Sequence, residues 1–522
     1  MHRTIEIFDS TLRDGAQGEG ISFSVHDKVQ ILKALDTIGV AYVEAGNPGS
    51  NPKDLEFFKA AESLDLKHAR LCAFGSTRRR DIRVEDDVNV QSMLQANTPV
   101  AVIFGKSWDF HVTEIIRTTH EENLAMIRDT IAFFKEKGKE VIFDAEHFFD
   151  GYKSNPEYAL KTLDAAIEGG ATTLVLCETN GGALPSQVFE ATTAVVKHCP
   201  DSKIGIHTHN DSGMAVANSV QAVEAGASHV QGTFVGFGER CGNANLSTLI
   251  PAFEVKMGIP SLPEGSLTML TSTATLIAEI ANIRIPHGMP YVGKSSFAHK
   301  GGMHIDGIGK NPLSFEHIQP QSVGNERRLL MSEVAGRSMI LKKIQKVSPD
   351  LAKDSPETKA IIKRLKELEM EGYQFEAAES SFELVIRKHL GKYRPFFELV
   401  HFKTIGEQPS EERATSSSAI VKIRVDGTEE ITAAEGDGPV NALDKALRKA
   451  LEVFYPVLKH VSLTDYKVRV LDSKQASAAR VRVLIESTDG MRTWTTVGVS
   501  TDIIQASWLA LVDSIEYRLM QA

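Results

Sequence analysis

Short β-rich runs recur about every 30 residues through the first half of this chain, and segments with helical patterning separate them. The helical segments include residues 26–38, 121–137, 159–169 and 215–225, and several end at glycine, as helices commonly do. Alternation of strand and helix predicts a parallel sheet, and eight units in about 250 residues favour a closed (β/α)8 barrel over an open sheet. The eight runs are residues 5–11, 42–45, 69–74, 100–104, 140–146, 173–178, 203–207 and 229–235.

The length of the chain requires more than one domain. At 522 residues it exceeds what one ordinary core accommodates. The barrel pattern gives way to loops after residue 280, and helical patterning returns later. We therefore expect an α/β barrel over residues 1–280, linker subdomains over 281–404 and an α+β domain over 405–522.

The predicted C-terminal domain contains an internal two-fold similarity. Residues 436–442 lead into a helix-like segment at 443–454, and residues 498–506 lead into a second such segment at 507–517. Each copy follows a strand-like run, at 420–425 in the first and at 480–485 in the second. Two similar halves with a seam between them are suited to a regulatory ligand.

Composition restricts the possible partners. A hydrophobic fraction of 42% and a charged fraction of 24% are typical of a globular protein, and a net charge of −10 argues against a nucleic-acid partner. The first residues contain no apolar signal region, and no run approaches the ~18 apolar residues of a membrane span. We therefore expect a cytoplasmic protein with no membrane partner. Its cysteines lack Cys-x-x-Cys spacing and should be reduced and mostly buried; they are Cys72, Cys177, Cys199 and Cys241.

Polar residues follow several predicted strands, at the rim where barrel enzymes place their catalytic groups. Arg13 and Asp14 follow the first strand, and His207 and His209 end the seventh, where alternate residues face the same way. Nitrogen and oxygen ligands suit a divalent ion used as a Lewis acid, and a neighbouring arginine suits an anionic substrate with a carbonyl group. Other polar groups after the predicted strands are Glu44, Glu146, His147, Glu178, Thr179 and the glycine-rich loop 236–245.

Each of these signals also has a plainer structural interpretation. A lone histidine is usually a core or surface residue, and Arg-Asp-Gly occurs by chance in many proteins. A shared position on one rim favours the metal site. Gly236-x-Gly238 has the wrong spacing for a nucleotide fingerprint. Residues 78–80, three arginines, fit a solvated charge run better than a phosphate clamp, although they are the nearest candidate for binding an anionic cofactor.

With these residues placed, the chain resembles the metal-dependent α-isopropylmalate, homocitrate and citramalate synthase family over nearly its whole length. The motifs DSTLRDG at 9–15, HTHND at 207–211 and GERCGNANL at 238–246 are similar to the barrel signatures of that family. AHKGGMHIDG at 298–307 is similar to the family's segment after the barrel. About the last 120 residues resemble its allosteric domain.

The resemblance implies roles for individual residues. Four would bind a divalent ion (Mn, Mg, Zn or Co), namely Asp14, His207, His209 and Asn243. Arg13 would polarise the keto oxygen, with Gln17, Glu44 and Thr179 also contacting the substrate. His304 and Asp306 are at positions implicated in deprotonating acetyl-CoA, and Asn311 and Leu313 would bind CoA. Glu146 is at a position that lines the keto-acid pocket and would relay the proton for His304. In relatives the histidine at the position of His304 reaches the barrel of the partner subunit, which implies a homodimer. Ile305 and Phe315 depart from the family pattern and leave the CoA contacts open.

Within the family, residues 46–54, 104–109 and 371–376 are most similar to the citramalate synthase branch. The bulky Phe104 at the mouth of the fourth strand favours a small keto acid such as pyruvate. The implied reaction joins acetyl-CoA to pyruvate and hydrolyses the thioester, giving (R)-citramalate and CoA for isoleucine biosynthesis, with isoleucine as the expected effector. The alternatives are condensation with 2-oxoisovalerate or 2-oxoglutarate, cleavage of a hydroxyacyl-CoA, and a metal-binding sensor without activity.

Overall fold

The computed structural model of the protein describes residues 3–330, 344–345, 347–349, 351–352, 355–407, 416–471 and 479–521. These residues form two compact units. The first comprises Met1–Ala298 and Glu316–Arg328, and the second comprises His299–Phe315 and Leu329–Ala522.

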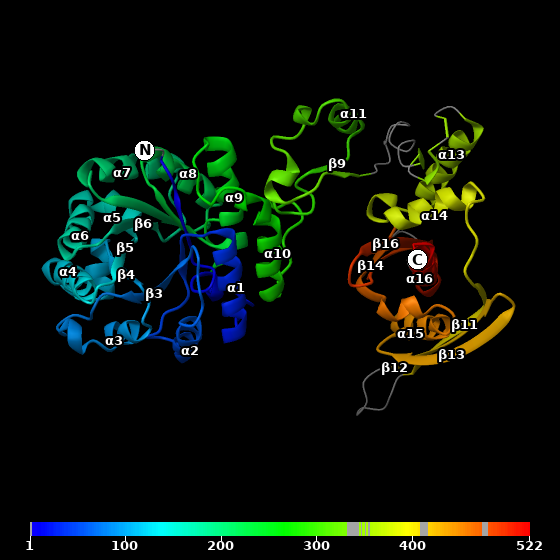
Figure 1. Cartoon of the computed structure of the whole chain (residues 1–522), viewed down its shortest axis with the longest axis horizontal. Coiled ribbons are helices and arrows are strands. Elements are labelled where there is room, and N and C mark those ends of the chain that lie inside the picture. The colour runs from blue at the N-terminus through cyan, green and yellow to red at the C-terminus, as the bar shows by residue number, and fades with distance from the viewer. Residues whose placement is uncertain are drawn as a thin grey trace. The chain divides into compact units, whose positions relative to one another are not determined.

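The first unit is a closed eight-stranded parallel barrel with strands in sequence order, β1 pairing with both β2 and β8 (Figure 1). This confirms the predicted fold class. The strands are β1 (Glu6–Asp9), β2 (Tyr42–Glu44), β3 (Arg70–Ser76), β4 (Val100–Lys106), β5 (Glu140–Glu146), β6 (Thr173–Glu178), β7 (Lys203–Thr208) and β8 (His229–Gly232). The helices are α1 (Val25–Ile38), α2 (Pro52–Ala61), α3 (Val88–Gln95), α4 (His120–Glu136), α5 (Phe148–Ser154), α6 (Pro156–Gly169), α7 (Pro185–His198), α8 (Ala215–Ala225), α9 (Leu246–Pro251) and α10 (Leu270–Ile280).

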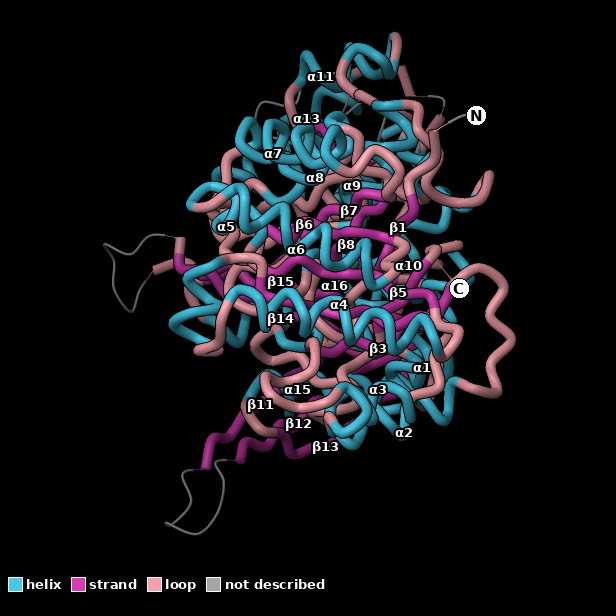
Figure 2. The backbone as a smooth tube through the Cα atoms, turned by 90° about the vertical axis from the view of Figure 1, so that its left-hand side faces the viewer, coloured by secondary structure: helices cyan, strands magenta, loops and turns pink. Residues whose placement is uncertain are grey.

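Local sequence explains where the barrel elements begin and end. Most residues of the barrel strands are buried because helices cover the outer face of the barrel, and Figure 2 shows helices around these strands. Ser24 and Asp27 form a capping box that starts α1, and Gly39 ends this helix in the left-handed conformation. Asn155 caps α6 just before Pro156. These signals set the bounds of helices that connect the barrel strands.

The eighth strand is shorter than predicted. It ends at Gly232, and Val235 adopts a left-handed conformation with φ of 62° instead of continuing the strand. The backbone of Thr233 instead pairs with the later segment of the same loop, since its N–H donates to the Ala244 carbonyl at 3.0 Å. The loop therefore folds back over the rim of the barrel.

The second unit contains two similar α+β halves, which confirms the predicted repeat. In each half a three-stranded antiparallel sheet precedes a long helix that packs against it. Gly436 and Gly498 occupy matching positions where a Cβ would meet backbone atoms of the following helix at 2.5 and 2.0 Å. The first half is β11 (Glu398–Glu407), β12 (Ser416–Val425), β13 (Thr428–Gly436) and α15 (Pro439–Glu452); the second is β14 (Ser462–Val470), β15 (Val481–Thr488), β16 (Thr493–Ser500) and α16 (Ile503–Met520). Other elements are β9 (Ala298–His299), α11 (Gly302–Lys310), β10 (Arg328–Leu329), α13 (Pro356–Glu371) and α14 (Glu379–His389).

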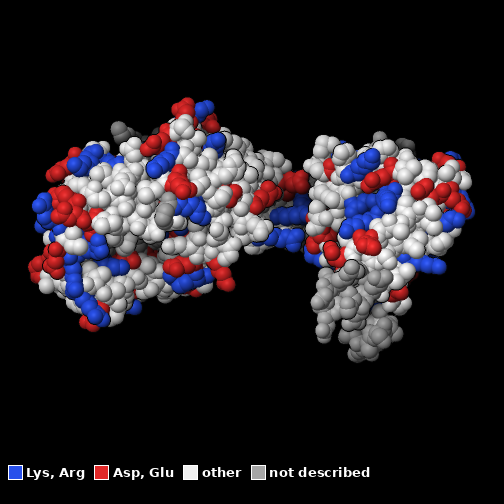
Figure 3. Space-filling view, turned by 90° about the horizontal axis from the view of Figure 1, so that it is seen from below, with Lys and Arg blue, Asp and Glu red and all other residues white. Residues whose placement is uncertain are grey.

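The structure tests the predicted burial of the cysteines and the predicted solvation of the arginine run, and each prediction has one exception. On the face in Figure 3, basic side chains of the barrel lie among acidic ones. In the described part of the chain, no helix has the length and apolar character that crossing a membrane requires. Three of the four cysteines are buried, whereas Cys241 is exposed because the loop after β8 holds it at the surface. Arg78 is not solvated either: it is 7% exposed and pairs with Glu122 and Asp129 at 2.6 and 2.9 Å.

Candidate metal centre and active site

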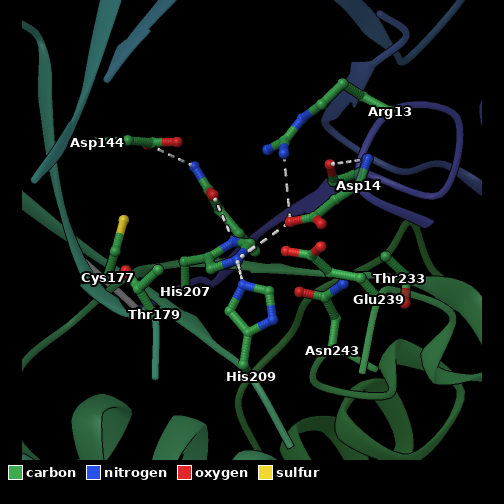
Figure 4. Close-up of polar contacts among 12 residues, drawn as sticks. Arg13, Asp14, Asp144, Cys177, Thr179, His207, His209, Thr233, Glu239 and Asn243 are labelled. Atoms are coloured by element: carbon green, nitrogen blue, oxygen red, sulfur yellow. Dashed lines mark hydrogen bonds and ion pairs between the residues drawn. The ribbon is translucent and has the colours of Figure 1, made fainter. Parts of the chain in front are cut away.

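Asp14, His207 and His209 converge at the rim of the barrel, with ligand atoms all within 4.8 Å of one another (Figure 4). His207 Nε2 lies 3.3 Å from both Asp14 Oδ2 and His209 Nε2. Burial and the neighbouring His207 lower the pKa of His209 to about 3, so this imidazole is neutral at physiological pH. Burial disfavours the charged form of Asp14, but Arg13 and His207 hold its pKa well below the ordinary value. The cluster therefore presents an ionised carboxylate beside a neutral imidazole.

A hydrogen-bonded chain behind His207 orients its ring. Gln231 on β8 donates from Nε2 to Asp144 Oδ1 at 3.0 Å, which turns its Oε1 toward His207 Nδ1, also at 3.0 Å. Because that oxygen can only accept, His207 Nδ1 carries a proton, and in the neutral ring Nε2 has a lone pair facing Asp14 and His209. Asp144 and Gln231 are buried, at 4% and 0% exposure. Partners of this kind commonly fix the tautomer of a metal-binding histidine.

The residues at this site fit a divalent cation. Lone pairs of two imidazole nitrogens and a carboxylate oxygen face one another at short range, which is unfavourable unless a proton or cation lies among them. Asn243 Nδ2 donates to the Phe237 carbonyl at 2.9 Å, and its buried Oδ1 has no hydrogen-bond partner among the described residues. A backbone bridge joins His209 to Asn243, and Figure 4 shows that amide beside the cluster. Nitrogen and oxygen donors together suit Zn²⁺, Mn²⁺ or Co²⁺.

Arg13 is held from three sides beside this cluster. Its Nε donates to Glu44 Oε2 at 2.6 Å, and its Nη1 lies 3.3 Å from Asp14 Oδ2. The guanidinium carbon lies 3.8 Å from the ring centroid of Phe74, which stacks in turn on Phe104 at 5.0 Å. Glu44 is fully buried and also accepts from Ser10. Glu44 therefore lies behind the arginine and orients it.

A cavity of about 300 Å³ adjoins Arg13, and Gln17 and Phe74 are among its lining residues. Glu146, at the end of β5, forms an ion pair with Lys106 from the end of β4. Thr179 follows β6, and its hydroxyl accepts the backbone N–H of His147 at 2.9 Å. The structure thus places three predicted residues, Gln17, Glu146 and Thr179, on the rim of the barrel.

The predicted acetyl-CoA residues lie in the second unit. His304 and Asp306 are on α11, where the His304 imidazole stacks on Phe315 with ring centroids 4.1 Å apart. Asp306 pairs with Lys310 at 2.6 Å. Asn311 accepts the backbone N–H of Leu313, whose side chain is 75% exposed. The cluster of Asp14, His207 and His209 therefore contains none of the predicted acetyl-CoA residues.

Sequence reasoning missed Gln231, Asp144, Lys106 and Phe74. Gln231 and Asp144 are polar residues within apolar strand runs, and a buried polar side chain needs a partner. That pattern is a usable signal. For Lys106 the signal is weaker, because the predicted strand ended at residue 104, whereas β4 continues to this lysine.

Three family profiles cover most of the chain. "HMGL-like" matches residues 4–277, "Homocitrate synthase post-HMGL domain-like" matches 291–372, and "LeuA allosteric (dimerisation) domain" matches 376–519. The first match coincides with the barrel and its rim cluster, and the third contains both α+β halves.

Whole-chain relatives share this organisation. The (R)-citramalate synthase of Aquifex aeolicus is 51% identical over 521 residues, covering 100% of this chain and 99% of the relative. That of Geobacter sulfurreducens is 50% identical, covering 99% and 97%. A probable 2-isopropylmalate synthase of Methanopyrus kandleri is 31% identical, covering 98% and 97%. The chain is therefore more similar to these two (R)-citramalate synthases than to this probable 2-isopropylmalate synthase.

Proposed function

The chain belongs to the HMGL-like family, in its (R)-citramalate synthase group, and on this basis we propose that it condenses acetyl-CoA with pyruvate and releases (R)-citramalate and CoA. Five relatives described as (R)-citramalate synthase, at 45–51% identity over nearly the whole chain, carry this proposal. The match to the LeuA allosteric domain supports a regulated synthase over a lyase.

We propose that Asp14, His207, His209 and Asn243 hold the divalent ion, which as a Lewis acid would polarise the keto group of pyruvate. Arg13 would bind the substrate carboxylate and keto oxygen with its planar fork of donors. The same fork would stabilise negative charge on that oxygen in the transition state. Glu44 and Phe74 contribute by holding the guanidinium in place before the substrate arrives.

Carbon–carbon bond formation requires a proton to leave the methyl group of acetyl-CoA. By family resemblance, the partner subunit's His304 is the proposed base, with Asp306 and Glu146 assisting. The carbanion equivalent then attacks the keto carbon, and the keto oxygen becomes an alkoxide that takes up a proton. Water finally cleaves the thioester to give a carboxylate and the thiol of CoA. We assign Gln17 and Thr179 to substrate binding, and Asn311 and Leu313 to CoA.

The regulatory part of the proposal concerns the second unit. We propose that the chain acts as a homodimer in isoleucine biosynthesis and that its two α+β halves bind isoleucine as a feedback inhibitor. The match to the LeuA allosteric (dimerisation) domain and the duplicated architecture support a dimer and an effector site, and the choice of isoleucine follows from the proposed product.

Thiol release from acetyl-CoA tests the function directly. Pyruvate, 2-oxobutanoate, 2-oxoisovalerate and 2-oxoglutarate should be compared at matched concentrations, with and without a chelator. We expect kcat/KM for pyruvate to exceed that for 2-oxoisovalerate by about 10-fold or more, since small differences in an apolar pocket are worth that much. A chelator should remove activity, and added Mn²⁺ or Co²⁺ should restore it.

Chiral chromatography of the product provides the second readout. The expected product is (R)-citramalate in equal amount to free CoA. A preference for 2-oxoisovalerate or 2-oxoglutarate would show that the chain has a different synthase activity. Thiol release at the same rate without any keto acid would contradict the proposed condensation.

A further inference from the structure

A second group of potential metal ligands lies on the outer helical layer of the barrel, between α6 and α7. Asp164 is on α6, His198 is the last residue of α7, and Cys199 follows it directly. The ligand atoms of these three residues lie within 4.8 Å of one another. His198 Nε2 and Asp164 Oδ1 are 2.8 Å apart. Among the described residues, this group and the rim cluster are the two sets of His, Cys, Asp or Glu with such geometry.

We propose that Asp164, His198 and Cys199 form a zinc-class metal site that is separate from the catalytic centre. One oxygen, one nitrogen and one sulfur donor match the ligands that Zn²⁺ takes in proteins, whereas Mg²⁺ and Ca²⁺ prefer oxygen alone. Three protein ligands would leave the fourth position for water.

The exposure of the three residues suits ion entry. The His198 and Asp164 side chains are 37% and 47% exposed, whereas Cys199 is 4% exposed beneath them. An ion could therefore reach the site from solvent and contact sulfur on its buried side.

The alternative interpretation is an ordinary Asp–His ion pair above a core thiol. His147 and Asp150 form such a pair at 3.0 Å, without a third ligand close enough to form a described cluster. The site between α6 and α7 differs because a sulfur atom completes it. An ion bound there would link α6 to the segment that leads into β7, and binding to the folded state alone would stabilise the barrel.

Cobalt spectroscopy distinguishes the two sites because the rim cluster contains no sulfur. The test uses metal-depleted full-length protein carrying Cys241→Ser, which removes the exposed thiol. We expect two equivalents of Co²⁺ to bind, and one of them should produce the near-ultraviolet thiolate-to-cobalt charge-transfer band. In this background, Cys199→Ser should abolish the band and one equivalent of binding, while Cys72 and Cys177 remain unchanged.

The exposed ligands provide variants that are expected to fold normally. Asp164→Asn and His198→Ala should each weaken the sulfur-containing site by about 10-fold or more, the scale on which ligand environments act. Neither should change kcat/KM measured with Mn²⁺. Zn²⁺ should raise the melting temperature of the parent more than that of Asp164→Asn. Absence of the band, its survival in Cys199→Ser, or unaltered affinity in both exposed-ligand variants would overturn the proposal.

Discussion

The proposed role of Arg13 depends on the residues that surround its guanidinium. Arg-Asp-Gly is common, but here Glu44, Asp14 and Phe74 constrain the guanidinium on three sides. A side chain fixed in this way needs little reorganisation when charge develops on a substrate oxygen. The predicted importance of Arg13 thus depends on two strand ends besides its own.

Arg13→Lys should lower kcat by ~10²-fold or more without unfolding the protein, because a single ammonium cannot form two parallel hydrogen bonds. Steady-state kinetics and thermal unfolding measure the two effects separately. Arg128→Lys is a suitable control, since this arginine is on α4 and its side chain is 45% exposed. Near-normal kcat in folded Arg13→Lys would remove Arg13 from the mechanism.

Gln231→Leu should weaken binding of the divalent ion by ~10- to 100-fold, the usual effect of losing a partner that orients a ligand. Without the Gln231 oxygen, His207 Nδ1 loses its acceptor and the ring can change tautomer. Calorimetry of the metal-free protein measures affinity, and nitrogen NMR of the histidines reports the tautomer. Gln221→Leu on α8 is the matched control, because its side chain contacts Glu224 at the surface. Equal affinity in both variants would show that the chain of hydrogen bonds does not support the metal site.

The sequence contained enough information to bring Arg13, Asp14, His207 and His209 to one rim, because strand ends in a parallel barrel share an edge. It did not identify Gln231 or Asp144. Their importance arises from a hydrogen bond between β5 and β8, whose two residues are 87 positions apart in the sequence. Local patterns identify groups at strand ends more readily than groups inside the barrel.

At the scale of elements, strand positions followed from apolar runs, and strand ends depended on tertiary contacts. The predicted strand at 140–146 coincides with β5, and 173–178 coincides with β6. The eighth predicted strand extends three residues too far. The β propensity of residues 233–235 does not reveal that the later part of the loop folds back onto them. That returning loop carries Asn243, so the error lies beside the proposed metal site.

Gly242→Ala should displace this loop and weaken metal binding. Gly242 has φ of 87°, and an added Cβ would lie 2.1 Å from the Gly236 carbonyl oxygen, so the backbone before Asn243 must move. Gly213→Ala separates strain from this collision, because Gly213 has φ of 74° with no atom within 4 Å of its added Cβ. Both variants should lose ~1 kcal/mol of stability from the left-handed backbone. Metal titration should distinguish them, and equal affinities would contradict the assigned role of the loop.

At the scale of the whole molecule, the proposed role of His304 requires two subunits. Mixing inactive Arg13→Ala with inactive His304→Ala should restore about a quarter of wild-type activity after full exchange, because half the dimers are mixed and each has one complete site. Native mass spectrometry of differently tagged chains must first show the mixed dimer. No recovery in demonstrated mixed dimers would place His304 with its own barrel or outside the chemistry.

The proposed feedback regulation is assigned to the duplicated domain, whose two halves differ where a ligand carboxylate would bind. Asp502 caps α16 by accepting two backbone N–H groups, whereas α15 begins after Gly438 with no side-chain cap. The α15 terminus is therefore the better position for the carboxylate of isoleucine, because helix N-termini attract anions. A coupling of ~1 to 3 kcal/mol between this position and the active site is enough for strong inhibition.

Gly438→Asp should abolish inhibition by isoleucine while keeping basal activity, because its carboxylate would occupy the free terminus. An added Cβ at Gly438 meets no atom within 4 Å, and the same holds for Gly406 on β11, which makes Gly406→Asp the control for added charge. Calorimetry with isoleucine, leucine and valine should accompany the inhibition curves of all three proteins. Retained inhibition in Gly438→Asp would move the effector away from α15. If none of the three amino acids binds the wild-type chain, the duplicated domain has a structural role, since an effector that does not bind cannot shift a conformational equilibrium.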